Sequence, residues 1–264
     1  MTTIPTDDAL AVAATEAIHS GNAAELERLL ADHPELATAR LRGGPECARP
    51  ERVTRTLLHV ATDWPGHYPN GAATVAALTA AGADVNSRFT GPHTETPLHW
   101  AASSDDVEVR DALLDAGADI EPPGAIIGGG TPLDDAVAFG QWNAARRLVE
   151  RGATPRLWHA AALGRLDLVK RHFAEPPRPA RDDVTEAFWQ ACHGGQRQTA
   201  EYLLDRGADR DWVGYDDSPR SAQPSRGRRQ LAASPRRCPH RLDELTRVPV
   251  ATPRRAMRDR QNAR

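Results

Sequence analysis

The chain has 264 residues, of which 40% are hydrophobic and 26% are charged, and its formal net charge is −3. These fractions are typical of a folded protein and exclude a chain that is disordered throughout. Because no apolar run approaches the roughly 20 residues that span a bilayer, and the first residues lack a basic region followed by an apolar stretch, we expect a cytoplasmic protein without a membrane segment or a secretory signal.

Two helices are expected near the start of the chain, on either side of the turn Ser20-Gly21-Asn22. Further along, a Gly-Ala-Asp triplet begins at Gly82 and again at Gly117, and Gly-Ala-Thr begins at Gly152, at intervals of 35 residues. Another Gly-Ala-Asp triplet begins at Gly207. A recurrence of this kind indicates that one supersecondary unit is stacked several times.

A helix-start motif precedes the first three of these triplets: Thr-Leu-Leu-His at 56–59, Thr-Pro-Leu-His at 96–99 and Thr-Pro-Leu-Asp at 131–134. Thr96 can cap its helix, and Pro97 suits the first helical position, where a missing N–H costs nothing. A second helix is expected over Val107 to Ala116, whose apolar residues have helical spacing, and Gly117 would end it in the left-handed conformation.

This combination of motifs resembles the ankyrin family, whose unit of about 33 residues carries a Thr-Pro-Leu-His-x-Ala signature. The resemblance covers roughly residues 8 to 217, and the phrases at 63–67 and 191–195 resemble a bacterial subgroup of the family. It implies an all-α solenoid of stacked helix-turn-helix units with inter-repeat loops, which binds other proteins and is not an enzyme. Six units are expected, at about 8–40, 54–86, 94–121, 129–155, 157–179 and 183–213, and the first would be an N-terminal cap.

The repeat pattern stops after Tyr215. From Ser218 onward the chain has thirteen arginines and three acidic residues, so we expect a disordered basic tail at 218–264. Two origins of this segment stay open: a native tail, or a C-terminal cap whose reading frame has shifted. The tail has no aromatic residues to stack on bases, and the rest of the chain is acidic, so a nucleic-acid partner is not expected. A protein partner with a basic surface fits better.

Several side chains could suggest catalysis or metal binding. His59, His99 and His159 occupy equivalent positions in their units, which favours a hydrogen bond within the helix start over a catalytic role. Cys192 and His193 are adjacent on a helix and so point about 100° apart, which argues against a nucleophile with its base.

Other motifs also favour structural roles. The glycines at 128–130 lack the Gly-Lys-Ser/Thr of a phosphate-binding loop. The acidic pairs at 105–106, 134–135 and 182–183 suit helix N-termini, where the helix dipole stabilises negative charge. We therefore expect no catalytic residue, no metal and no cofactor.

The binding candidates lie in irregular loops and at the ends of the first helices. The loop at 63–71 separates the two helices of the second unit and brings Trp64, His67 and Tyr68 together, and aromatic side chains on rigid loops are typical interface anchors. By resemblance, the concave face would also include Arg88, Phe89, Ser103, Ser104, Phe139, Leu163 and His193.

Two alternatives remain for this loop. It could cover the side of the stack without binding anything. It could also line a cleft near Trp64 and His67, as in a small-molecule binder or hydrolase, although such a site needs polar residues that converge in a closed pocket. The favoured hypothesis is a monomeric protein-interaction scaffold.

Overall fold

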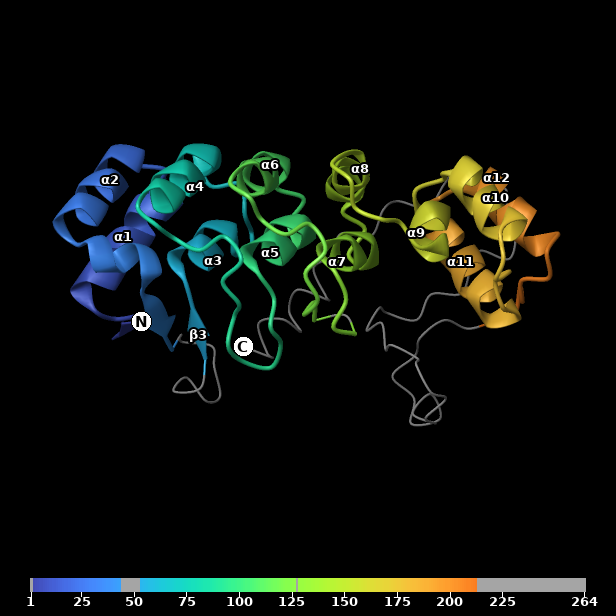
Figure 1. Ribbon diagram of the computed structural model, residues 1–264, viewed down its shortest axis with the longest axis horizontal. Coiled ribbons are helices and arrows are strands. Elements are labelled where there is room, and N and C mark those ends of the chain that lie inside the picture. The colour runs from blue at the N-terminus through green and yellow to red at the C-terminus, as the bar shows by residue number, and fades with distance from the viewer. Residues whose placement is uncertain (1, 44–52, 127, 213–264) are drawn as a thin grey trace.

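A computed structural model describes residues 2–43, 53–126 and 128–212. Within these ranges, twelve α-helices follow one another as six helix pairs that form a stack (Figure 1). The first five helix pairs fall within the ranges expected for their units, and the sixth begins at Arg181, two residues before its expected range of 183–213. The expected tail at 218–264, and the end of the expected repeat domain at residue 217, lie outside the described residues.

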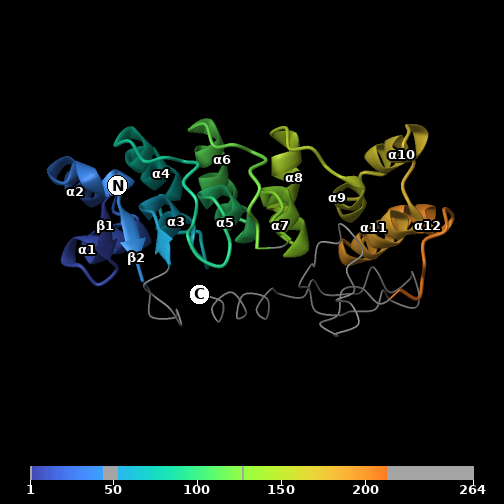
Figure 2. The ribbon, with the colours of Figure 1, turned by 60° about the horizontal axis from the view of Figure 1, so that its bottom comes forward.

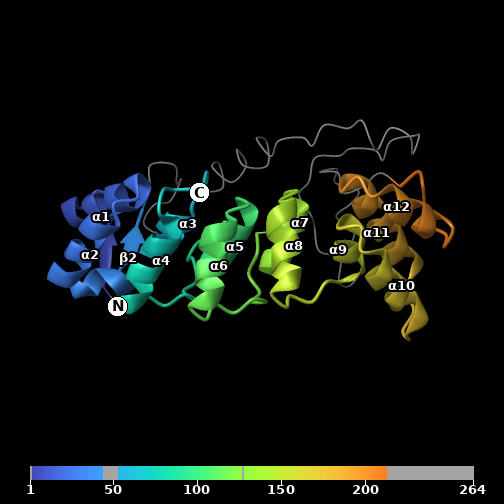
Figure 3. The same cartoon turned by 90° about the horizontal axis from the view of Figure 1, so that it is seen from above.

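Each pair has a first and a second helix. The first helices are α1 (Ala9–Ser20), α3 (Leu57–Thr62), α5 (Pro97–Ser103), α7 (Pro132–Ala138), α9 (Leu157–Ala162) and α11 (Arg181–His193). The second helices are α2 (Ala23–Asp32), α4 (Gly71–Ala80), α6 (Val107–Asp115), α8 (Trp142–Glu150), α10 (Leu166–Ala174) and α12 (Arg197–Leu204). In the first four pairs, the first helices lie in one row and the second helices in another (Figures 2 and 3).

Three short strands lie beside the first two pairs. They form one sheet in the order β1 (Thr3–Pro5), β2 (Arg40–Arg42) and β3 (Thr54–Arg55), in which β1 is parallel and β3 antiparallel to β2. A short 3-10 helix, Pro34–Thr38, leads from α2 into β2. Apart from these strands, the described chain is helical or irregular, which confirms the all-α solenoid.

Local sequence explains where the helices begin and end. The backbone N–H of Thr96 donates to Nδ1 of His99 at 3.1 Å, at the start of α5. Nδ1 of His59 accepts from its own threonine in the same way, at 3.3 Å, so the predicted helix-start role of these histidines is confirmed. Helix α6 ends at Asp115, one residue earlier than expected, and Gly117 has a left-handed φ of 91° as predicted.

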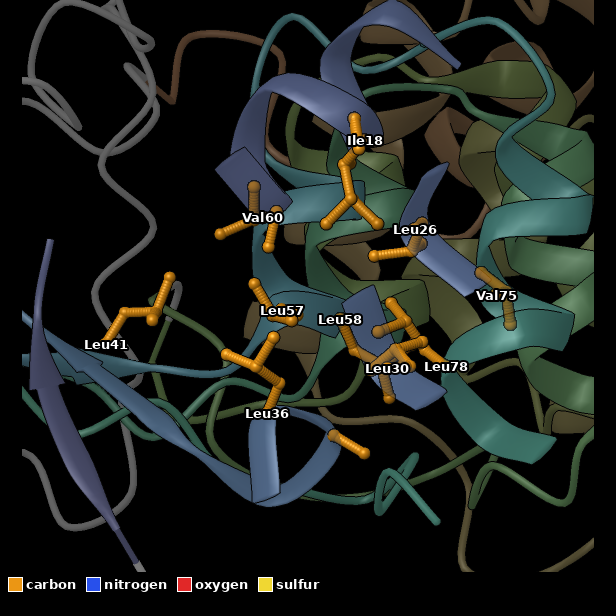
Figure 4. Close-up of a cluster of buried hydrophobic side chains, with 14 of the residues drawn as sticks. Ile18, Leu26, Leu30, Leu36, Leu41, Leu57, Leu58, Val60, Val75 and Leu78 are labelled. Atoms are coloured by element: carbon orange, nitrogen blue, oxygen red, sulfur yellow. The ribbon is translucent and has the colours of Figure 1, made fainter. Parts of the chain in front are cut away.

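The hydrophobic core runs along the stack between the helices. One cluster of buried side chains extends from Ala11 to Leu113 and a second from Ala102 to Leu203. Figure 4 shows how Ile18, Leu26, Leu57 and Leu78, from four different helices, contribute to the first cluster. No single pair could bury such a face alone, so each pair depends on its neighbours.

Candidate functional site

The loop that joins α3 to α4 is held by the preceding helix pair. The ring of Tyr68 stacks on the ring of His19 in α1, with centroids 4.4 Å apart and planes inclined by 20°. Next to this stack, Nδ2 of Asn70 donates to the carbonyl oxygen of Gly21 at 2.9 Å. The loop is therefore attached to the turn that ends α1.

The same loop is also held by the following helix pair. The backbone N–H of His67 donates to Oδ2 of Asp106 at 2.7 Å, and Nε2 of His67 lies 3.0 Å from the carbonyl oxygen of Ser104. The other carboxylate oxygen of Asp106 accepts from the N–H of Val109 at 3.2 Å and so caps α6. One buried carboxylate thus caps a helix and holds the loop.

Gly66 lets the loop approach α5 closely. Its φ is 69°, and a Cβ at this position would lie 2.9 Å from Oγ of Ser104. Any other residue would clash there and would also be strained in the left-handed conformation. The loop therefore packs against both neighbouring helix pairs.

Trp64 remains exposed in spite of these contacts. Its side chain is 44% exposed, and among the described residues only Val12, at 38%, is another exposed large apolar side chain. The backbone N–H of Trp64 donates to Oδ1 of Asp63 at 2.9 Å, while Oδ2 of Asp63 accepts from Arg55 at 2.6 Å. The indole is therefore presented to solvent from an ordered backbone.

Burial against the loop lowers the pKa of His19, an effect that the charge of Asp63 opposes and that of Arg55 reinforces. A neutral His19 suits its stacking against Tyr68, because an uncharged ring is cheaper to desolvate. His19 and Tyr68, the latter in the same loop as Trp64, thus form a stacked pair of uncharged rings.

Comparison with known families identifies the repeating unit. A family model described as ankyrin repeats, three copies, matches residues 58–156, which lie in the pairs from α3 to α8. These residues of the chain are ankyrin repeats. No curated protein matches it. Ankyrin repeats generally serve as protein–protein interaction modules, and proteins built from them are typically binding scaffolds without enzymatic activity.

Three predicted contact residues of the ankyrin array are buried. The side chain of Phe89 is 2% exposed and stacks on His93 with centroids 4.5 Å apart. Ser103 and Ser104 are 1% and 8% exposed, and both hydroxyls donate to the carbonyl oxygen of Trp100 at 3.0 Å. Because these side chains have little exposed surface in this arrangement, we correct the expectation and leave them out of the proposed interface.

The side chain of Arg88 is exposed, but its guanidinium group donates hydrogen bonds to backbone carbonyls. Its Nη1 donates to the carbonyl oxygens of Thr94 and Pro123, at 3.1 and 2.6 Å. It therefore ties one inter-repeat loop to the next. This contact explains why an arginine suits the position without requiring a partner protein.

The remaining predicted residues lie at the other end of the array. Phe139 and Leu163 are partly exposed and His193 is exposed. The imidazole of His193 contacts two indoles, with centroids 5.3 Å from Trp142 and 5.4 Å from Trp189. Sequence reasoning missed both tryptophans. Trp189 lies one helical turn before His193 on α11, a spacing that could have indicated its contact, whereas only the stacking of repeats brings Trp142 of α8 to the same imidazole.

Potential metal ligands do not gather at one place in the described residues. No cluster of three or more His, Cys, Asp and Glu side chains there could hold a metal ion. Burial lowers the pKa of His59 to about 3 and also lowers that of His159, so both rings are neutral structural groups at neutral pH. In the same ranges, no helix is both long and apolar enough to cross a membrane.

Proposed function

We propose that this ankyrin-repeat protein binds a partner protein through the loop at 63–71 and the adjoining concave face of the stack. The observation that carries the proposal is the exposed indole of Trp64 on a loop held from both sides. Tryptophan is enriched among the residues that dominate binding energy. Since the loop is already ordered, binding would not have to offset the cost of ordering it.

The charge of the repeats supports a partner with a basic surface. Up to residue 217, the sequence has 33 acidic and 20 basic residues. Opposite charge on the partner would speed the encounter, and added salt would slow it. The proposal takes the chain to act as a cytoplasmic monomer. His193, which contacts Trp142, and the partly exposed Phe139 and Leu163 would extend the contact surface toward the end of the array.

A crosslinking experiment tests the proposal. A photo-activatable amino acid replaces Trp64 in the full chain, and a matched control carries it at Lys170, an exposed residue of the second helix α10. Native lysate is the source of partners, and each captured protein is purified and its binding measured directly. We expect a partner that is captured at position 64 and not at position 170.

The double variant Trp64→Ala/Tyr68→Ala, with an unchanged helical spectrum, should then bind the purified partner at least tenfold more weakly, as is common when interface anchors are truncated. Unchanged affinity in this variant would show that the interface lies elsewhere. Capture at both positions would indicate non-specific adhesion and count against the loop.

A further inference from the structure

The side of helix α11 that points away from the hydrophobic core carries acidic and aromatic residues. Helix α11 packs on α9 and α12, and α12 is the last helix of the described chain. One side of α11 contributes buried residues at helical spacing, from Val184 to Ala191, to the second core cluster. By the same spacing, the opposite side carries a stripe of four residues, Asp182, Glu186, Trp189 and His193. These four residues are called the α11 stripe below.

The aromatic half of the stripe reaches across two repeats. The side chain of His193 is exposed, and its ring lies against Trp189 with centroids 5.4 Å apart and planes inclined by 19°. The same imidazole contacts Trp142 at the start of α8, with centroids 5.3 Å apart. Trp189 belongs to neither of the two core clusters. These rings therefore form a group beside the core, and His193 is its exposed member.

Negative charge collects at this end of the array. Seven acidic and four basic residues lie between residues 181 and 212, which gives the last pair a formal net charge of −3. Two of the four basic side chains are engaged, because Arg197 pairs with Glu201 at 2.9 Å and Arg206 lies over the ring of Tyr202. Within the described ranges, no ion pair is formed by Asp183, Asp205, Asp209 or Asp211.

The chain leaves the described residues next to this surface. The backbone N–H of Asp209 donates at 3.0 Å to Oγ1 of Thr185, which lies on α11 three residues after Asp182. Trp212, the last described residue of the chain, follows Asp209 by three residues. The five residues 213–217 can span at most about 18 Å. The basic segment that begins at residue 218 is therefore tethered close to the α11 stripe.

The segment at 218–264 has the charge that this surface lacks. It contains thirteen arginines and three acidic residues. A short connection between a segment and its binding site raises the effective concentration of the segment to the millimolar range. A separate basic protein has the same electrostatic attraction but no such connection. The tether and the charge together favour the chain's own segment as the occupant of this surface.

We propose that the basic segment 218–264 binds back on the last helix pair of its own molecule, at the α11 stripe and the aspartates that follow α12. A partner protein that reaches His193 then has to displace the segment, so the segment lowers the affinity of this end of the array. The inference goes beyond the proposed function, because it assigns a regulatory role to the chain's own segment. It does not depend on the loop at 63–71.

The test measures proximity within the full chain. The substitution Ser225→Cys places a nitroxide spin label in the segment, after serine has replaced the native cysteines Cys47, Cys192 and Cys238 and the helical spectrum has been found unchanged. The label broadens the indole N–H signals of nearby rings in the ¹⁵N-tryptophan spectrum. We expect the signal of Trp189, assigned with Trp189→Phe, to lose most of its intensity, and the signal of Trp64 to keep it.

A mixed sample shows whether the contact lies within one molecule. Spin-labelled chains without ¹⁵N are combined with ¹⁵N-labelled chains that carry no spin label. We expect no broadening in this mixture, because the segment binds its own array. Broadening in the mixture equal to that in the doubly labelled chain would show that the segment binds a second copy, and would overturn the inference.

A pair of charge variants tests the electrostatic basis. Asp183→Asn/Asp209→Asn removes two unpaired charges, while each amide oxygen can still accept the backbone N–H that the carboxylate accepts. This variant should recover the signal of Trp189, and added salt should act in the same way. The matched control Asp84→Asn/Asp119→Asn changes aspartates that accept an N–H two residues on, as Asp209 does, in earlier repeats. It should leave the broadening as it is.

An unbroadened Trp189 signal in the native background would overturn the inference, and so would equal effects of the two double variants. The inference and the proposed function can fail separately. If a partner is captured at position 64 while Trp189 stays unbroadened, the interaction role stands and the segment does not bind back. If Trp189 is broadened as expected but no protein is captured at position 64, the contact within the chain stands and the proposed role of the loop fails.

Discussion

The Nε2 atom of His59 lies 3.2 Å from the carbonyl oxygen of Glu95, which belongs to the next ankyrin repeat. Because Nδ1 of the same ring accepts the N–H of Thr56, the proton must sit on Nε2, which then donates to Glu95. The imidazole therefore closes its own helix start and joins two repeats. His99 does the same for the following pair, with its Nε2 3.3 Å from the carbonyl oxygen of Gly130.

The junction between the repeats of α7 and α9 has no such histidine–carbonyl hydrogen bond from the earlier repeat to the later one. Asp134 replaces the histidine, and its carboxylate accepts from the N–H of Thr131 to close the helix start. It has no proton to donate to the following repeat. Instead, Arg156 and His159 of that repeat approach the carboxylate. The link between these repeats thus depends on charge and not on a histidine–carbonyl hydrogen bond.

Replacing His99 by alanine should destabilise the protein. The side chain is fully buried, and its loss leaves the N–H of Thr96 and the carbonyl of Gly130 without their partner. We expect the free energy of unfolding to fall by about 2–4 kcal/mol, measured by urea denaturation. The control His33→Ala removes a half-exposed imidazole and should change it by less than about 0.5 kcal/mol. Similar losses in both variants would contradict the role given to His99.

Acid should destabilise the protein through its buried histidines. Burial lowers the pKa of His59 to about 3, from 6.5 when exposed, and the hydrogen bond to the carbonyl of Glu95 only partly offsets this. Below pH 6.5 the unfolded chain takes up a proton that the folded protein does not. The free energy of unfolding should therefore fall as the pH drops from about 6.5 toward about 3, by up to about 1.4 kcal/mol per pH unit for this group.

The variant His59→Gln isolates that contribution. Glutamine does not titrate in this range, so the loss of stability between pH 7 and pH 5, measured by urea denaturation, should be smaller than in the native chain. His159, whose pKa burial also lowers, remains in both proteins and cancels in the comparison. An identical pH dependence in the two proteins would exclude His59 as a source of acid sensitivity.

Replacing Asp111 should lower the free energy of unfolding more than replacing Asp115, an exposed aspartate on the same helix. Its carboxylate contacts Arg110 at 3.2 Å and Arg147 at 2.9 Å, and the side chain of Arg110 is fully buried. Burial raises the pKa of Asp111, but hydrogen bonds from Arg147 and Arg110 outweigh this and bring the pKa below its usual value. Asp111→Asn would remove the carboxylate that contacts the buried guanidinium and leave only the electrostatic effect of Asp105, and we expect a loss of about 2 kcal/mol in urea denaturation.

Asp115→Asn is the matched control for that change. Asp115 pairs with Arg151 at 2.6 Å, but its side chain is 71% exposed, so the loss should not exceed about 0.5 kcal/mol. Equal effects at both positions would show that the burial of Arg110 does not decide the strength of this network.

Gly66→Ala should disturb the loop, whereas Gly82→Ala should not. Both glycines have a left-handed φ, 69° and 95°, so each substitution introduces backbone strain of about 1–2 kcal/mol. Only at Gly66 would the new Cβ meet another residue, Oγ of Ser104 at 2.9 Å. Capture through position 64 should therefore decrease in Gly66→Ala and persist in Gly82→Ala. A reduction in both would mean that global stability controls binding, and not the position of the loop.

Much of the fold could be predicted because its signals are local. A motif such as Thr-Pro-Leu-His closes a hydrogen bond within four residues, and a glycine such as Gly117 ends a helix through its own φ. The loop at 63–71 could be recognised in the same way, from a cluster of aromatic residues and prolines between two helical patterns. Such features do not depend on where the neighbouring repeats lie.

The details of the candidate site could not be predicted in this way. Phe89 has an aromatic side chain in an inter-repeat loop, as Trp64 has in its loop, yet Phe89 is packed beneath His93 and Trp64 is open to solvent. The contact between Trp142 and His193 joins repeats that are not consecutive. No local pattern distinguishes these cases.

The sequence by itself determined the repeating helix pair, its turns and the acidic character of the array, because these depend on short-range geometry and on composition. Only the tertiary structure decided which side chains remain exposed and which carboxylates and guanidinium groups pair between repeats. Exposure and pairing are properties of the space between repeats, and that space exists only after each repeat has buried its apolar face against the next.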